Sequence, residues 1–180
     1  METINQFFNV EKILQYPHRE YVFFWSHRPA EKITKTCFSQ WFERDFVVNG
    51  YTYKCAEQYM MAQKAKLFGD EEIFQRILEV KTPKTMKDLG RKVKGFDSRV
   101  WNQHKFSIVV TGNLAKFSQN QDLKEFLLAT DDKVLVEASP YDNVWGIQLK
   151  ATDPRAVDPT QWEGENLLGF ALMQVRELLR

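Results

Sequence analysis

Short polar signals divide the middle of the chain into a hairpin followed by successive helices. Asn49-Gly50 stands between β-prone residues, where this dipeptide is a strong hairpin signal. Gly69 ends a helical stretch and Asp70 begins the next, a pattern typical of a left-handed C-terminal stop and an N-cap. Thr82-Pro83 combines a cap with the proline favoured in a first helical turn. We therefore predict one helix over about 55–68 and two more after Asp70 and Thr82.

Hydrophobic patterning predicts the remaining elements, which give a mainly α-helical fold with a few short β-strands. The stretch 138–165 is rich in Pro, Asp, Gly and Trp, and loops of this length commonly carry function. Residues 1–20 show no convincing period and are expected to be an N-terminal extension to a domain over 21–180. The other predicted elements are a buried strand at 21–25, a strand at 134–136, and helices that begin near Asp97, Asn120 and Asn166.

Composition favours a small or localised ligand over an extended polyanion. The 180 residues carry a formal charge of only +1, so the chain as a whole does not attract nucleic acid. Aromatic residues make up 14% of the chain, and such rings either build cores or stack on nucleobases. The sequence has two cysteines, a start without an apolar leader, and only short apolar runs. We expect a cytoplasmic protein with no membrane span and no obligate protein partner.

Glu57 and Lys64 are the first candidates for a site, because they share a face of the predicted helix over 55–68. Seven residues return to within about 20° of the same face and advance about 10 Å. That separation is too long for an ordinary salt bridge but suits a sugar-sized ligand. A solvated charged stripe explains the pair equally simply, since most charged side chains are exposed.

The second candidates lie in the loop 137–146 and on the last helix. The loop combines Glu137, Asp142 and Trp145 directly after a predicted strand, although a loop tryptophan often serves as a hydrophobic plug. On the last helix, Asn166 and Arg176 belong to a stripe opposite the leucines. The three histidines are scattered and no Cys/His set has zinc-ligand spacing, so no metal site is expected.

Several motifs in order resemble the NADAR family, also called the YbiA-like family, over about residues 20–180. The resemblance implies a YbiA-like, mainly helical domain without metal or organic cofactor. Three local departures concern the shape of the pocket: S-Q-W at 39–41, E-Q-Y at 57–59 and I-Q at 147–148. The motifs are A-E-Q-Y-M-M-A-Q-K-A at 56–65, L-G-R at 89–91, N-L-A-K-F-S-Q-N at 113–120, L-V-E-A-S-P-x-D-x-x-W-G at 135–146 and N-L-L-G-F-A-L-M-x-V-R at 166–176.

The resemblance also implies an N-glycosidase. The expected substrates are ribosylamino-pyrimidine 5'-phosphate intermediates of riboflavin biosynthesis. The alternatives are ADP-ribosylated guanine in nucleic acid and a non-catalytic module that binds ADP-ribose. The resemblance supports Lys64, Glu57 and Asp142 as catalytic residues, with Lys64 as the candidate nucleophile. The expected substrate-binding residues are Trp145 and Trp41 against base or ribose, Arg176, Lys116 and Arg91 as partners of the phosphate, and Asn166.

Overall fold

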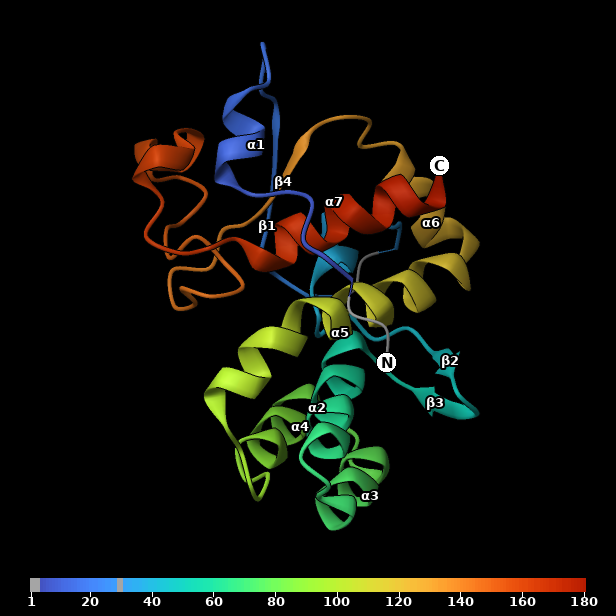
Figure 1. Cartoon of the computed structure of the whole chain (residues 1–180). Coiled ribbons are helices and arrows are strands. Elements are labelled where there is room, and N and C mark those ends of the chain that lie inside the picture. Colours follow the sequence, from blue (N-terminus) through green and yellow to red (C-terminus); the bar gives the residue numbers. More distant parts are fainter. Residues whose placement is uncertain (1–3, 29–30) are drawn as a thin grey trace. The chain divides into compact units, whose positions relative to one another are not determined.

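The computed structural model describes residues 4–28 and 31–180, and helices dominate this part of the chain (Figure 1). Its internal contacts divide it into two units. The first unit comprises residues 40–120 together with Ile4, and the second comprises residues 5–28, 31–39 and 121–180. The predicted mainly helical fold with a few short strands is confirmed.

The first unit is a helical cluster with one β-hairpin, and local signals set its boundaries. Asn49 and Gly50 both have positive φ and join the two antiparallel strands of the hairpin. Gly69 ends α2 at a φ of +71°, and the Asp70 carboxylate accepts a hydrogen bond from the amide of Ile73. The elements are β2 (Phe46–Val48), β3 (Tyr51–Tyr53), α2 (Ala56–Leu67), α3 (Glu71–Glu79), α4 (Pro83–Gly90) and α5 (Ser98–Ser118).

Helix α2 is the centre of the first unit. It packs against α3, α4 and α5 (Figure 1), so a helix that carries several polar residues is nevertheless buried on most of its surface. The close packing depends on two glycines of its neighbours. A Cβ at Gly112 of α5 would lie 2.4 Å from the Tyr59 ring, and one at Gly90 would lie 2.0 Å from the Met61 sulfur. A side chain at position 112 would push α5 away from the Tyr59 ring, and one at position 90 would displace the flexible Met61 side chain.

The second unit is built around a pair of parallel strands. Strand β1 (Tyr21–Phe24) pairs with β4 (Val134–Glu137), so that Tyr21 lies opposite Val134 and Phe24 opposite Glu137. The first three residues of β4 are fully buried against α7. The other elements of this unit are α1 (Val10–Leu14), η1 (Lys35–Phe38), α6 (Gln121–Leu128), η2 (Pro154–Val157), η3 (Pro159–Gln161) and α7 (Leu167–Leu179).

Two local expectations for the N-terminal part need correction. The stretch 1–20, in which no period was found, contains the short helix α1, capped by the side chain of Asn9. The strand expected to be buried at 21–25 ends at Phe24, its only buried residue, while Trp25 is 49% exposed. The boundary of the N-terminal extension stays a prediction, although Phe8 and Ile13 are buried in the second unit.

None of the helices in residues 4–28 and 31–180 is long and apolar enough to cross a bilayer. The cytoplasmic location stays a prediction.

Candidate functional site

The polar residues of α2 do not form a solvated face. Glu57 is 3% exposed, and the side chains of Gln58 and Gln63 are also buried. Gln58 has a structural role, because its oxygen accepts from the amide of Lys54 at 2.7 Å and its nitrogen donates to the carbonyl of Ile77 at 2.9 Å. The amide of Gln63 donates to the hydroxyl of Tyr53. The alternative that Glu57 belongs to a solvated charged stripe is therefore wrong.

Glu57 lies in the first turn of α2, where the positive end of the helix dipole stabilises an anion. Its amide donates to the carbonyl of Gln40 at 2.9 Å, which joins the segment before the hairpin to the start of the helix. Lys116 of α5 is fully buried in the same neighbourhood, since Glu57 raises and Lys116 lowers the pKa of the adjacent Cys55 thiol. A buried carboxylate near a buried ammonium marks a functional candidate, because both are costly to desolvate.

Cys55 itself is not the nucleophile. Burial raises the pKa of its thiol to about 11, with a smaller contribution from the Glu57 charge. A thiol with that pKa is protonated at neutral pH and is therefore a poor nucleophile.

Lys64 lies near the other end of α2, half-buried against two aromatic rings. Its Nζ is 4.2 Å from the centroid of the Phe96 ring and 5.6 Å from that of Trp101. Burial lowers the pKa of the Lys64 ammonium, and the positive charge of Arg91 lowers it further, while Glu57 opposes the shift. The rings hold the amine in place by cation–π attraction. An amine with a lowered pKa is available as a nucleophile in a larger fraction of molecules.

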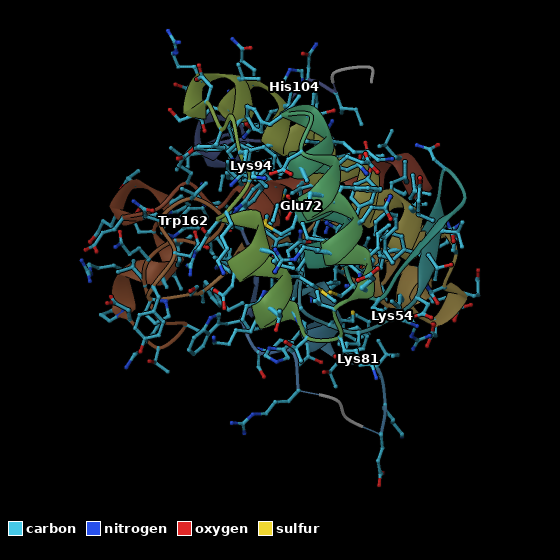
Figure 2. All side chains as sticks on the ribbon, turned by 90° about the horizontal axis from the view of Figure 1, so that it is seen from below. Lys54, Glu72, Lys81, Lys94, His104 and Trp162 are labelled. Carbon is cyan, nitrogen blue, oxygen red and sulfur yellow. The ribbon has the colours of Figure 1, made fainter. Side chains whose placement is uncertain are left out.

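One charged pair of the first unit contrasts with Lys64, because both of its members are ordinary surface charges. Lys94 and Glu72 lie side by side with 2.9 Å between Nζ and Oε2, and both side chains are mostly exposed (Figure 2). Exposed pairs of this kind contribute little to stability. The environment of Lys64 therefore differs from that of the exposed lysine in the same unit.

In the second unit, Asp142 and Trp145 are joined by the geometry of a turn. One carboxylate oxygen of Asp142 accepts from the amides of Val144 at 2.9 Å and Trp145 at 2.8 Å. Both side chains are partly exposed. The aspartate thus fixes the backbone that carries the indole. Its predicted catalytic role stays a prediction, as does substrate binding by Trp145.

Asn166, the N-cap residue of α7, and Arg176, within α7, both have structural partners. Asn166, at a φ of +53°, accepts from the amide of Glu137 and donates to the carbonyl of Leu135, both at 3.0 Å. Arg176 is 1% exposed and donates at 2.9 Å to the hydroxyl of Thr130 and to the carbonyl of Lys133. Burial lowers the pKa of its guanidinium. Their roles toward a substrate stay predictions.

Gly169 explains why α7 can lie so close to β4. A Cβ at this position would be 2.1 Å from the carbonyl oxygen of Leu135. The glycine therefore permits the close approach of a backbone segment.

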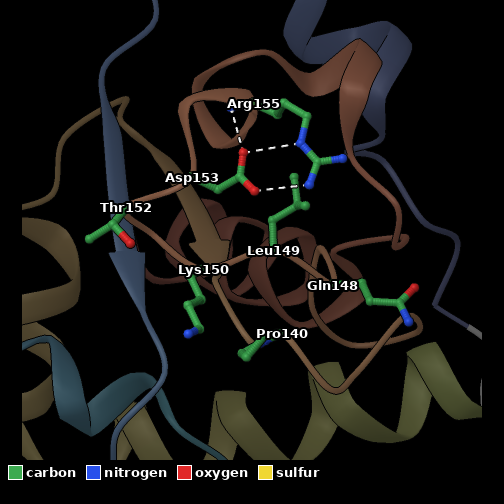
Figure 3. Close-up of a pocket in the computed structure, with 7 residues that line it drawn as sticks. All are labelled: Pro140, Gln148, Leu149, Lys150, Thr152, Asp153 and Arg155. Carbon is green, nitrogen blue, oxygen red and sulfur yellow. Dashed lines mark hydrogen bonds and ion pairs between the residues drawn. The ribbon is translucent and has the colours of Figure 1, made fainter.

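A pocket of about 300 Å³ opens in the second unit around Leu149, Lys150 and Thr152 (Figure 3). The Arg155 guanidinium on its wall already donates to both carboxylate oxygens of Asp153, at 3.1 and 2.9 Å. Gln148, one of the departures from the family motifs, lines this pocket, but none of the predicted catalytic or substrate-binding residues does. The pocket is therefore not the candidate site.

Four residues next to the predicted ones were not predicted from the sequence. Phe96 and Trp101 flank Lys64, while Gln40 and Asn113 lie beside Glu57 and Lys116. The sequence offered one sign of Phe96, because this aromatic residue stands between Gly95 and the helix cap Asp97. Trp41 is half-buried next to Gln40. Within the first unit the structure thus places Arg91 near Lys64, and Lys116 near Glu57.

Comparison with known proteins identifies the family. The sequence model of the NADAR domain family matches residues 23–180, nearly nine-tenths of the chain. The chain belongs to the NADAR family. An N-glycosidase of Acanthamoeba polyphaga mimivirus is 49% identical to this NADAR chain over 145 residues, which cover 78% of this chain and 85% of the viral protein. N-glycosidase YbiA of Escherichia coli is 33% identical over 132 residues, 73% of this chain and 74% of YbiA.

The fold of this NADAR chain also resembles a solved structure. The NMR structure of Escherichia coli YbiA superimposes with a TM-score of 0.73 at 27% sequence identity. The superposition covers 95% of this chain and 91% of YbiA. The predicted resemblance to the YbiA-like family is therefore confirmed.

Proposed function

We propose that this NADAR protein hydrolyses the N-glycosidic bond of a ribosylamino-pyrimidine 5'-phosphate of the kind formed in riboflavin biosynthesis. The reaction class is that of the family: the chain is an N-glycosidase, a hydrolase of N-glycosyl compounds. The observation that carries the proposal is Lys64, an amine with a lowered pKa held against the rings of Phe96 and Trp101.

The proposed role of Lys64 is covalent. When the ribose ring opens, C1 forms an iminium with the departing base, and the neutral Nζ of Lys64 attacks C1. The C1–N bond to the base then breaks, and the base leaves as a free amine after it receives a proton. Water adds to the remaining lysine iminium, which releases ribose 5-phosphate and restores the Lys64 amine. The sum of these steps is the hydrolysis of one N-glycosidic bond by one water molecule.

The proposed role of Glu57 is electrostatic. Positive charge develops at C1 as the bond to nitrogen breaks, and a preorganised carboxylate lowers the energy of that state. Burial of Glu57 supports this role, because a charge acts more strongly where water is excluded. The predicted contacts of Arg91 and Lys116 with the phosphate belong to the same proposal, and the delivery of a proton by Asp142 stays a prediction.

ADP-ribosylated guanine in nucleic acid is the alternative substrate. The formal charge of +1 gives no attraction for a strand, and this favours the small phosphorylated substrate. A module that only binds ADP-ribose would have no need of an amine with a lowered pKa.

The test is to incubate the protein separately with a ribosylamino-pyrimidine 5'-phosphate, an ADP-ribosylated guanine oligonucleotide and free ADP-ribose. We expect liquid chromatography with mass detection to find ribose 5-phosphate and the free base in the first reaction. Release of ADP-ribose from the oligonucleotide alone would assign the alternative substrate. Binding of ADP-ribose without turnover of either substrate would contradict the enzymatic proposal.

A further inference from the structure

Two buried amide side chains meet in the first unit next to the candidate catalytic residues. Nδ2 of Asn113, on α5, donates to Oε1 of Gln40 at 2.8 Å and to the backbone carbonyl of Val109 at 2.9 Å. Asn113 is fully buried and Gln40 is 7% exposed. The two residues are 73 positions apart in the sequence, so their contact is a feature of the folded unit.

The backbone fixes which way each amide faces. The Val109 carbonyl can only accept, so the nitrogen of Asn113 must face it, and the oxygen of Gln40 must then face that nitrogen. This arrangement leaves Nε2 of Gln40 as a donor and Oδ1 of Asn113 as an acceptor. Neither buried atom has a hydrogen-bond partner among residues 4–28 and 31–180.

Two other buried amides among the described residues form hydrogen bonds through both their oxygen and their nitrogen. Gln58 accepts from Lys54 and donates to Ile77, while Asn166 accepts from Glu137 and donates to Leu135. Buried polar groups that lack partners are costly, and folded proteins keep few of them. Where they persist, a ligand is one reason for their retention.

The pair lies directly beside the residues proposed to act on the substrate. The carbonyl of Gln40 accepts from the amide of Glu57 at 2.9 Å, and Asn113 precedes Lys116 by one helical turn. A donor and an acceptor on neighbouring side chains complement an N–H and a C=O on one edge of a ring.

We propose that Gln40 and Asn113 together recognise the lactam edge of the leaving base, a ring C=O beside a ring N–H. Nε2 of Gln40 donates to the carbonyl oxygen, and Oδ1 of Asn113 accepts from the ring N–H. Oxo-pyrimidines and 6-oxopurines such as guanine share this edge. The pair therefore recognises bases that carry the edge, but it does not distinguish oxo-pyrimidines from 6-oxopurines. The inference rests on the proposed N-glycosidase function and names the chemical class of its leaving group.

The first test compares two substrates of the wild-type protein. One is a ribosylamino-pyrimidinone 5'-phosphate, and the other is its lactim ether, in which methylation of the ring oxygen removes the N–H donor. We expect kcat/KM to be about 10–100-fold lower for the lactim ether, because one buried acceptor is left unpaired. A guanine-linked ribosyl substrate run in parallel distinguishes the two sources of the edge. Equal kcat/KM for the pyrimidinone and its ether overturns the inference.

The second test removes the Gln40 donor. Gln40→Glu keeps the oxygen that accepts from Asn113 and replaces only Nε2, whereas Gln40→Met removes both polar atoms. We expect each variant to lower kcat/KM for the pyrimidinone by about 10–100-fold and for the lactim ether by less than about threefold. Selectivity between the two substrates therefore collapses.

Gln63→Met is the matched control, because Gln63 is an equally buried amide with its own partner, the Tyr53 hydroxyl. We expect this variant to keep the selectivity of the wild type, even where its melting temperature falls. If the Gln40 variants lose activity equally on both substrates, the pair is structural and the inference fails. If the wild type cleaves none of the ribosylated substrates, the proposed function fails instead.

Discussion

Helices α2 and α7 both bury polar side chains, but these side chains have different surroundings. On α7, Asn166 and Arg176 meet backbone carbonyls, a hydroxyl and a backbone amide at about hydrogen-bond distance. On α2, Lys64 meets two aromatic rings and lies within the field of Arg91, and its pKa is lowered. Buried polar residues thus serve structural bonding at α7, whereas α2 also carries an amine that is available for chemistry.

Burial alone therefore does not identify a catalytic residue. A buried polar group with backbone partners stabilises the fold, because losing it leaves those partners unsatisfied. An amine that is half-buried against aromatic rings and has a lowered pKa, as Lys64 is, is a better candidate for function. Substitutions should therefore lower activity when they fall on Glu57 or Lys64 and lower stability when they fall on α7.

The largest effect should come from the α2 residues. We expect Lys64→Ala and Glu57→Gln each to lower kcat on the order of 10³-fold or more, because a nucleophile or a charge at C1 is lost. The melting temperature should change little, since Lys64 is half-buried and Gln has nearly the shape of Glu. Stopped assays with mass detection, together with thermal melts, check both parts. Retained turnover in both variants would contradict the site assignment.

The next largest effect is a loss of stability when the contact between α7 and β4 is disturbed. Gly169→Ala should destabilise the protein by about 1–3 kcal/mol, because its Cβ would meet the Leu135 carbonyl oxygen at 2.1 Å. Urea unfolding gives the free energy of unfolding. Leu178→Ala, at an exposed position of the same helix, is the control and should change it much less. A Gly169→Ala protein as stable as wild type would show that this contact is not tight.

A similar loss of stability should follow Arg176→Met. The substitution leaves the Thr130 hydroxyl and the Lys133 carbonyl without their donor, at a cost of about 1–3 kcal/mol. Arg180→Met, which removes an exposed salt bridge with Asp132, should cost less than about 1 kcal/mol. We expect KM to stay unchanged in Arg176→Met. A rise in KM for the phosphorylated substrate only would instead support the predicted contact with phosphate.

The smallest effect concerns the pH dependence of the reaction. The positive charge of Arg91 lowers the pKa of Lys64, so Arg91→Met should raise that pKa. The neutral amine then appears at higher pH, and the acid limb of the kcat/KM profile should move upward. The shift should stay below about one pH unit and shrink with added salt, because Arg91 is exposed. Arg99→Met, an exposed arginine paired with Asp97, is the control. A downward shift would contradict the electrostatic account of Lys64.

Local chemistry explains which parts of the fold the sequence could predict. The Asn49-Gly50 turn, the Gly69 stop and the caps at Asp70 and Thr82 act within a few residues, and all of them are confirmed. The parallel pairing of β1 with β4 joins residues more than a hundred positions apart, and no local signal encodes it. Propensity and periodicity report neighbours along the chain, and they do not report partners across it.

The same limit applies to the candidate site. Helical spacing placed Glu57 and Lys64 on one face, but it could not distinguish an exposed stripe from a buried one. Burial comes from the packing of α3, α4 and α5 around α2. The contacts of Lys64 with Phe96 and Trp101 are likewise made between separate elements.

Borohydride reduction converts an iminium between Lys64 and ribose C1 into a stable adduct that can be detected. The protein is incubated with a ribosylamino-pyrimidine 5'-phosphate and reduced during turnover, and its peptides are then analysed by mass spectrometry. We predict that the peptide containing Lys64 gains the mass of a reduced ribosyl phosphate, and that Lys64→Ala gains none. Product formation without any adduct on Lys64 would contradict the covalent role of Lys64 and would favour direct attack by water beside Glu57.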